Sequence, residues 1–386
     1  MKDKEYKEFY MKQLWIIILI SFAAHLCFAV QPVVTNSSAS QRTDGSKIVD
    51  IYYDVSDAEH DSVYVTLKLS FDGGSTFTFS PTMPNLSGDI NKIPVGTGKH
   101  IIWNAGNEGQ NFDGSQFAMK IQAWNTIPVP TNFAFVQGGT FTMGNTYGNS
   151  SSDGLLHQVT LTSYYIDKYE VTQQEWLDVM GTNPSHFTGN LSRPVEQVSW
   201  YAAIAYCNKR SMMEYLTPCY TYEGYGTNPD DWPAGWNSGA HNNFVCNFND
   251  NGYRLPTESE WEYAAKGGNL SHNYQYSGSN NLSLVAWYYG NSTAQTHAVS
   301  ALSANELAAY DMSGNVWEWC WDWYDGGYYS VSPTVNPTGP ETGSFRVDRG
   351  GSWGDGASLN RVALRNLYTP SGTAVSLGFR LARSLP

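Results

Sequence analysis

The segment richest in possible chemistry is residues 346–382, which read RVDRGGSWGDGASLNRVALRNLYTPSGTAVSLGFRLA and contain no cysteine. Ser352 lies in a Gly-Gly-Ser-Trp-Gly run that fits the G-x-S-x-G pattern of a serine nucleophile. In a hydrolase of that type the triad histidine follows the serine in the chain. The last histidine here is His297, so the order of the groups excludes that mechanism. The chain has no HExxH, P-loop or dinucleotide-binding pattern.

The cysteines are a second source of chemistry. Cys207, Cys219, Cys246 and Cys320 follow the N-terminal segment, and four cysteines permit three full pairings. Cys219 and Cys246 flank a stretch rich in Gly, Asn and Pro, where a cross-link would stabilise the fold by roughly 3 to 4 kcal/mol. We expect a disulfide between these two residues, and free buried thiols at Cys207 and Cys320.

Tryptophan alternates with other residues in segment 317–323, which reads WEWCWDW. Successive side chains of an extended strand point to opposite faces, so the four indoles share one face while Glu318, Cys320 and Asp322 share the other. Aromatic side chains dominate core burial. We therefore expect a core strand whose carboxylate face is open to a functional role.

The sequence predicts the starts of two helices. Thr172 with Glu175, and Thr257 with Glu260, have the spacing of a capping box. The glutamates of the second segment, RLPTESEWEYAA, could act as general bases. Caps and ion pairs with Arg254 are the favoured interpretation.

The N-terminal part of the chain has a different pattern of apolar and polar residues. Apolar and polar residues alternate in segments 49–55 and 63–70, and turn-forming residues follow each run, which is typical of half-buried strands. This pattern predicts a small all-β domain over residues 30–126, an immunoglobulin-like sandwich. Residues 127–132 predict a stiff linker, and residues 133–386 predict a second domain.

Residues 1–29 have the features of a secretion signal. A short basic start is followed by an apolar run over residues 14–24, too short to span a bilayer comfortably, and by small residues up to Ala29. We expect cleavage after Ala29, no membrane span, and a secreted, periplasmic or cell-surface protein in which disulfides can form.

Composition limits the possible partners. The net charge of −13 argues against nucleic acid and against an anionic membrane surface. Length permits two domains, and 36 glycines with 14 tryptophans indicate a loop-rich fold packed around aromatic rings.

Several motifs in the second half of the chain occur in a fixed order. Besides the C-terminal block, they are FVQGGTFTMG (135–144), YEVTQQEW (169–176), RPVEQVSW (193–200), GYRLPTESEWEYAAKGG (252–268) and YDMSGNVWEW (310–319). In that order they closely resemble the formylglycine-generating enzyme, or sulfatase-modifying factor, family. The resemblance covers roughly residues 133–383 and implies a loop-rich α+β fold similar to the C-type lectin fold.

The resemblance also implies a chemistry that this chain is not equipped for. The family oxidises a substrate cysteine to formylglycine with two cysteines that hold Cu(I) in the loop after Gly-Gly-Ser, and Cu(I) requires such soft thiolates. Asp355 and Asn360 stand near those positions here, while Ser352 matches the serine of the oxygen pocket. We expect no copper and no catalytic residue. The alternative, a formylglycine-generating oxidase of sulfatases or another oxygen-dependent enzyme, would have to use Cys320 or Cys207.

One calcium site carries over from the resemblance. The matching positions are Asp311, Gly314, Val316 and Glu318, where carboxylate and carbonyl oxygens suit a hard cation. The pattern of the family's other calcium site is missing from residues 287–302, so we expect one ion.

Some secreted relatives with this fold use the C-terminal loop to bind ligands. We therefore predict a non-catalytic scaffold that binds a protein or another cell-surface or extracellular ligand. The side chains expected at that surface are Trp353, Asn360, Arg361, Arg365, Asn366 and Tyr368.

Overall fold

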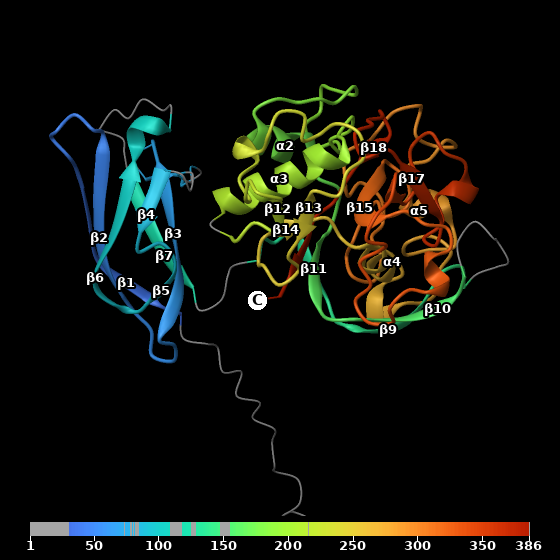
Figure 1. Cartoon of the computed structure of the whole chain (residues 1–386), viewed down its shortest axis with the longest axis horizontal. Helices are drawn as coiled ribbons and strands as arrows, with labels where there is room; N and C mark the ends of the chain where they lie inside the picture. Colours follow the sequence, from blue (N-terminus) through green and yellow to red (C-terminus); the bar gives the residue numbers. More distant parts are fainter. Residues whose placement is uncertain are drawn as a thin grey trace, which may run out of the picture.

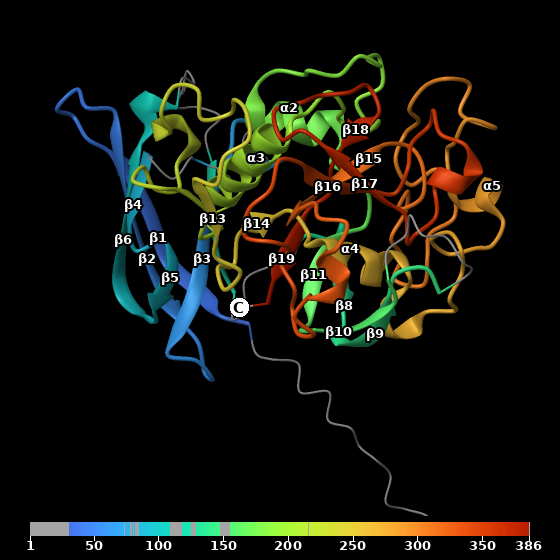
Figure 2. The same cartoon turned by 45° about the vertical axis from the view of Figure 1, so that its right-hand side comes forward.

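The computed structural model describes residues 31–72, 74–77, 79, 81, 85–108, 118–124, 129–146, 155–214 and 216–385. Two bodies lie side by side in both views: an all-strand N-terminal body and a larger body with strands and a few helices (Figures 1 and 2). This arrangement confirms the α+β class with a preceding β-sandwich. The expected secretion signal, residues 1–29, lies outside the described residues, and so does part of the expected linker.

The N-terminal body consists of two sheets that share one core. The first has the order β1-β2-β6-β4 and the second the order β5-β3-β7. Val63, Val65, Leu67 and Leu69 on β3 are fully buried and pack with residues of β2 and β6, which confirms the period-two pattern. The strands are β1 (Val33–Gln41), β2 (Ile48–Ser56), β3 (Ser62–Ser70), β4 (Leu86–Gly88), β5 (Asn91–Pro94), β6 (Gly96–Asn104) and β7 (Ala118–Trp124).

The larger body is built on two four-stranded sheets with helices around them. One sheet has the order β14-β19-β11-β8 and the other the order β17-β16-β15-β18. Their strands are β8 (Phe133–Val136), β11 (Tyr164–Asp167), β14 (Tyr253–Arg254), β15 (Trp317–Trp323), β16 (Arg346–Arg349), β17 (Arg365–Tyr368), β18 (Leu377–Gly378) and β19 (Ala382–Ser384). Two ribbons complete it: β9 (Gly139–Met143) with β10 (His157–Leu161), and β12 (Tyr220–Tyr222) with β13 (Phe244–Cys246).

Two of the helices begin where the sequence predicts. Both capping boxes form, at Thr172 before α2 (Gln173–Met180) and at Thr257 before α4 (Glu258–Ala265). α3 (Trp200–Met213) starts at the Ser199 cap, and α5 (Leu282–Val285) is a single turn. No helix in the described part of the chain is both long and apolar enough to cross a membrane.

β15 divides the core of the larger body, as its alternation predicts. Trp317 and Trp319 lie in the cluster that contains α3, whereas Cys320 lies in the cluster that contains α4. On the α4 side, Glu318 accepts a hydrogen bond from the Trp261 indole (2.7 Å). The polar face of the strand is therefore buried against α4 and is not open to solvent.

The expected disulfide does not form. Cys219 and Cys246 are free thiols in the structure, as are Cys207 and Cys320. The ladder between β12 and β13 pairs Cys246 with Tyr220, and the Cys219 carbonyl accepts from the Asn247 amide (2.9 Å). With this register Cys219 is opposite Asn247, and neighbouring residues of a strand point to opposite faces. The offset of one residue separates the two thiols.

Candidate functional site

The C-terminal loop, residues 350–364, connects two neighbouring strands. The last residue of β16, Arg349, pairs directly with the first residue of β17, Arg365. The loop therefore leaves and re-enters the sheet at one position, and its shape depends on how these two arginines are held.

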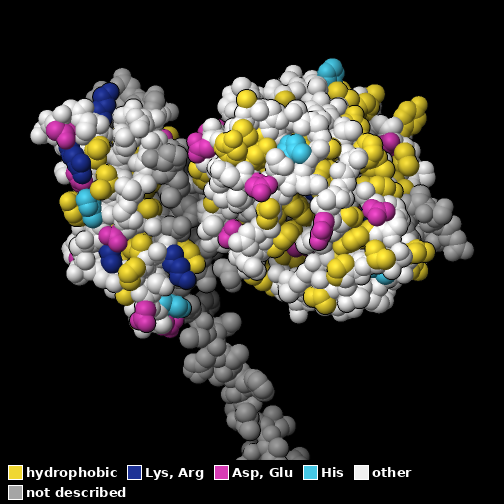
Figure 3. Space-filling view, viewed as in Figure 1, with side chains coloured by type: hydrophobic (Ala, Val, Ile, Leu, Met, Phe, Trp, Pro, Cys, Tyr) yellow, Lys and Arg dark blue, Asp and Glu magenta, His cyan; other side chains and the backbone are white. Residues whose placement is uncertain are grey.

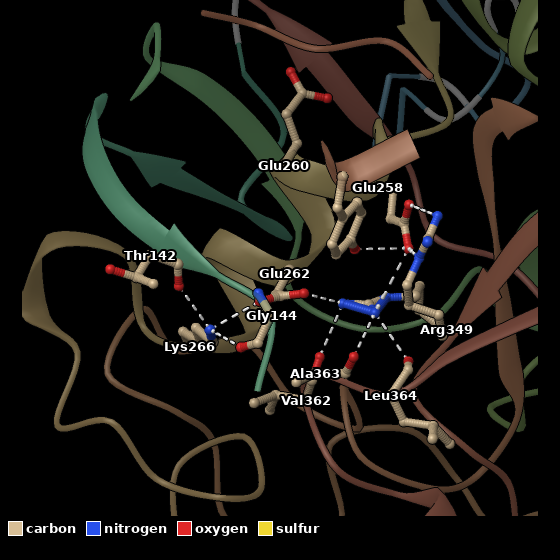
Figure 4. A network of polar contacts seen from close by, with 12 residues as sticks. Thr142, Gly144, Glu258, Glu260, Glu262, Lys266, Arg349, Val362, Ala363 and Leu364 are labelled. Carbon is tan, nitrogen blue, oxygen red and sulfur yellow. Dashed lines mark hydrogen bonds and ion pairs between the residues drawn. The ribbon is translucent and has the colours of Figure 1, made fainter. Parts of the chain in front are cut away.

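Arg349 is held by α4 and by the returning end of the loop. One of its terminal nitrogens (Nη2) contacts the Glu262 carboxylate, which also accepts from Lys266 (2.8 Å) and from the Gly144 amide (2.7 Å). Arg349 also donates to the carbonyls of residues 362–364 at 2.9 to 3.3 Å. Figure 4 shows Glu262 lying between the lysine and the arginine. Both Glu262 and Arg349 are fully buried, so they are shielded from solvent.

Arg365 is held by Glu258, which lies on α4 one turn before Glu262. It forms two bonds with Glu258 (2.6 and 2.8 Å), and the Tyr329 hydroxyl donates to the same carboxylate (3.1 Å). Arg365 and the neighbouring Arg349 keep the pKa of the Glu258 carboxyl below its ordinary value in spite of burial. The two glutamates of α4 thus fix both ends of the loop.

Inside the loop, Asp355 and Asn360, which are expected near the positions of the family cysteines, take part in hydrogen bonds. The Asp355 carboxylate accepts from the Ser352 hydroxyl and from the Trp317 indole (2.9 Å). Asn360 is fully buried and donates to the Gly356 carbonyl (2.9 Å). Neither side chain is a soft ligand, and Asp355 holds the serine hydroxyl that the resemblance assigns to the oxygen pocket.

The predicted binding residues divide into two groups. Trp353, Arg361 and Asn366 are partly exposed, and Tyr368 is exposed. Asn360 and Arg365 are 0 % and 7 % exposed, which corrects their assignment to the surface. Both serve the internal support of the loop, because buried polar groups require internal partners.

Sequence reasoning missed one exposed aromatic residue beside the loop. The Tyr289 side chain is 78 % exposed, and its amide donates to the Asp355 carbonyl (3.0 Å). Leu359, within the loop, is 40 % exposed. Tyr289 is distant in sequence from the loop, and no local pattern distinguishes it from the many other tyrosines.

The predicted calcium positions lie in a buried acidic group. Asp311 accepts from the Ser300 amide through one oxygen (2.7 Å), whereas its other oxygen, Oδ1, is buried without a hydrogen-bond partner. Glu318 forms two bonds of 2.6 Å with Arg380, and Glu170 accepts from the Val316 amide (3.1 Å). One arginine thus faces three buried carboxylates.

The described part of the chain has no group of three or more His, Cys, Asp or Glu side chains arranged to hold a metal ion, so a cation here would depend on the excess of negative charge and on carbonyl oxygens. Burial raises the pKa of Asp311 to about 6, and burial together with Asp311 raises the pKa of Glu170 well above its ordinary value. The unpartnered Asp311 oxygen fits a calcium ligand. Glu318 fits less well, because both of its oxygens already accept from Arg380.

The thiols that an oxidase would have to recruit are inaccessible. Cys207 and Cys320 are fully buried, and burial raises the pKa of both thiols well above the ordinary value. A reactive cysteine must be an exposed thiolate, so neither residue meets the requirement.

The fold and the site together define a class: a mixed α+β scaffold that presents a hairpin loop on buried ion pairs. The protein-family model described as the sulfatase-modifying factor enzyme 1-like domain matches residues 123–385 of the chain. The chain belongs to this family. Formylglycine-generating enzyme of Thermomonospora curvata is 29 % identical over 296 residues, which are 64 % of this chain and 91 % of that protein.

Two further similarities extend over the same region. A protein of Paenibacillus barcinonensis named chaperone protein LppX is 41 % identical over 281 residues, covering 66 % of this chain and 90 % of that protein. Among solved structures, Treponema denticola variable protein 1 is 39 % identical with a TM-score of 0.59, covering 65 % of this chain and 94 % of that one.

Proposed function

We propose that this protein is an exported, non-catalytic member of its family that binds a protein partner through the surface of the C-terminal loop. The observation that carries the proposal is the state of the two positions that hold copper in the enzymes. The resemblance places Asp355 and Asn360 near those positions, and both are engaged in hydrogen bonds that shape the loop.

The support of the loop favours binding over chemistry. Its two ends are fixed by Glu258 and Glu262, which are rigid because α4 and the neighbouring strands surround them. The residues between can differ while the ends stay in place. Binding surfaces with fixed frames lose less conformational entropy on association.

The exposed groups of the loop suit a protein partner. Trp353 packs edge-on against Phe187 at 5.3 Å, so its position is set before binding. Tyr289 and Tyr368 add exposed aromatic area, and tyrosine and tryptophan are enriched among residues that carry interface energy. The name of the Paenibacillus relative, a chaperone, supports a partner that is a protein.

The test is capture of partners by the immobilised full-length mature protein from the secreted and cell-surface fractions of the producing cells, with quantitative mass spectrometry. We expect Tyr289→Ala combined with Tyr368→Ala to reduce capture at least 10-fold. Tyr225→Ala removes an exposed tyrosine (50 %) that lies outside the C-terminal loop and should capture as the unchanged protein does. Equal capture by both variants would exclude the loop surface.

The alternative function is tested directly. The purified protein is incubated with Cu(I), oxygen and a CxPxR peptide, and the peptide mass is measured beside a cysteine-containing family enzyme. We expect no conversion of thiol to aldehyde, because the only described thiols are buried or lie away from the loop. Conversion that is abolished in Cys320→Ser would establish an oxidase.

We also propose that one calcium ion binds in the buried acidic group. Asp311, with its unpartnered oxygen, would hold the ion together with the carbonyls of Gly314 and Val316 and with Glu318. The ion would neutralise excess negative charge and stabilise the folded state. Calcium should raise the unfolding temperature relative to EGTA, and Asp311→Ala should abolish the difference; no difference in the unchanged protein would contradict the site.

A further inference from the structure

A cavity of about 730 Å³ opens at the sheet formed by β14, β19, β11 and β8. Tyr164 of β11, Arg254 of β14 and Ser384 of β19 contribute to its lining. No lining residue belongs to the C-terminal loop or to the buried acidic group. Its volume lies within the range of about 300 to 1,000 Å³ that is typical of small-molecule sites.

One wall of the cavity is a strap, residues 334–338, that is fixed to the edge of β10. The Thr160 amide donates to the Thr334 carbonyl (2.7 Å), and the Asn336 amide donates back to the Thr160 carbonyl (2.9 Å). The side-chain oxygen of Asn336 accepts from the Thr162 amide (2.9 Å). These contacts fix the position of this wall.

Asn336 itself is held in an uncommon conformation. Its φ of 44° lies in the left-handed region, which few residues other than glycine adopt. Because Thr162 engages its side-chain oxygen, the side-chain nitrogen is the group that remains to donate to a ligand.

The cavity has polar walls without free charge. Among the lining residues that the structure describes, Arg254 and Glu260 are the only charged ones, and they bind each other through two contacts of 2.6 and 2.7 Å. The remaining nitrogen donors of Arg254 are engaged by the Ser384 hydroxyl and the Leu255 carbonyl at 3.2 Å. A phosphate, a carboxylate or an ammonium group would find no unpaired opposite charge here.

The other lining residues combine amides and hydroxyls with apolar side chains and two aromatic residues, Tyr164 and Phe248. Asn249 and Thr338 contribute an amide and a hydroxyl, and the half-buried Phe248 contributes its ring. The Arg254 guanidinium lies 5.0 Å from the centre of that ring and so fixes its orientation. Amide and hydroxyl groups beside an aromatic ring match the hydroxyl groups and C–H faces of sugars.

We propose that this cavity is a binding site for a neutral oligosaccharide. The side chains of Asn249, Asn336 and Thr338 hydrogen-bond its hydroxyl groups, and Phe248 contacts a C–H face. The site is independent of the partner surface proposed for the C-terminal loop.

The test is isothermal titration calorimetry of the full-length mature protein with cellotriose, maltotriose and chitotriose, and with trigalacturonate as a charged counterpart. We expect at least one neutral trisaccharide to bind, and trigalacturonate to bind at least 10-fold more weakly. The double variant Asn249→Ala, Thr338→Ala should weaken binding of the neutral sugar at least 10-fold.

Two controls separate this result from other causes. Asn242→Ala removes an exposed amide outside the cavity and should bind the sugar as the unchanged protein does. Tyr289→Ala should also bind normally, since it alters only the surface beside the C-terminal loop. The proposal is overturned if none of the three sugars binds at millimolar concentration, if the cavity variant binds unchanged, or if trigalacturonate binds more tightly.

Discussion

Five of the seven buried arginines of the larger body fall into two kinds. Arg254, Arg349, Arg365 and Arg380 each contact a buried glutamate. Arg346 lies instead between indole rings, 3.7 Å from the centre of Trp200 and 3.5 Å from that of Trp323, and burial lowers its pKa to about 9. The charge of each arginine is thus compensated by a carboxylate or by aromatic faces.

Among the charged residues that hold the C-terminal loop, Glu262 should be the one whose substitution lowers the unfolding free energy most. Glu262→Gln leaves the buried cations of Lys266 and Arg349 without their shared carboxylate. Breaking a buried ion pair from one side costs about 3 to 5 kcal/mol, and we expect a loss of that order in urea denaturation. Glu223→Gln, on an exposed carboxylate, should change the unfolding free energy by less than about 0.5 kcal/mol.

Asp348 should make stability depend on pH. Burial raises its pKa from 3.8 to about 7, so the folded state binds this proton more tightly than the unfolded state does. The resulting stabilisation is complete below pH 3.8 and is lost as pH rises through 7.

The substitution Asp348→Asn removes this titration and can still accept from Asn366, which donates to Asp348 at 2.8 Å. Relative to the unchanged protein, we expect the variant to gain about 2 to 4 kcal/mol between pH 4 and pH 8. Urea denaturation at both pH values measures the gain. A constant difference across that range would show that Asp348 is charged throughout, and Glu341→Gln, on the surface, should give no such trend.

At the scale of elements, the C-terminal loop is a hairpin connection whose turn depends on glycine. Gly350 and Gly351 both have positive φ, 99° and 78°. A Cβ at Gly351 would lie 2.5 Å from the Asn360 side-chain oxygen and 2.8 Å from the Leu359 carbonyl. The sharp exit from β16 is therefore possible only without a side chain.

The matched pair Gly351→Ala and Gly356→Ala tests this dependence. We expect Gly351→Ala to lower the unfolding free energy by about 1 to 3 kcal/mol, because it adds left-handed strain and close contacts. At Gly356 a Cβ would have open space around it, and the loss should stay below about 0.5 kcal/mol. Chemical denaturation of both variants measures the difference, and equal losses would contradict the proposed geometry.

Local sequence patterns predicted helices and strands well. They did not predict contacts between residues that are far apart in the chain. Both capping boxes, the alternation of β15 and the ion pair of Arg254 with Glu260 involve residues close together in the chain. The pairing of Glu258 with Arg365 spans 107 residues, and no sequence spacing encodes it. For the same reason the buried positions of Asn360 and Arg365 could not be foreseen.

The missing disulfide has a different cause. The flanking positions of Cys219 and Cys246 indicated correctly that the two residues lie on neighbouring segments. Whether their side chains meet depends on strand register, and a shift of one residue reverses the face of every side chain. The observed pairing of Cys246 with Tyr220 decides against the bond.

At the scale of the whole molecule, the two bodies have separate hydrophobic cores. Tyr64 of the sandwich is partly buried against the core of the larger body. We expect residues 129–386 alone to unfold within about 4 °C of the larger body in the full chain, a shift equivalent to about 1 kcal/mol. Scanning calorimetry of both proteins measures the shift; failure of the shorter chain to fold would show that the sandwich is required.

The surface of the larger body has few positive charges because of where its arginines lie. Most of its arginines are buried, and the face seen in Figure 3 shows Lys and Arg side chains on the sandwich but hydrophobic and acidic ones on the larger body. A partner of the larger body therefore meets few cations. Apolar and hydrogen-bonding contacts should dominate, and binding should depend weakly on salt.

The support of the C-terminal loop has a practical consequence for protein engineering. Arg349 and Arg365 meet at one point of the sheet and are paired with two glutamates of one helix, so the exposed residues between them form a replaceable cassette. A library randomised at the exposed positions 354 and 357–359, with both arginines and Gly351 retained, would yield folded members at high frequency. The domain would then serve as a display framework from which new binding specificities are selected.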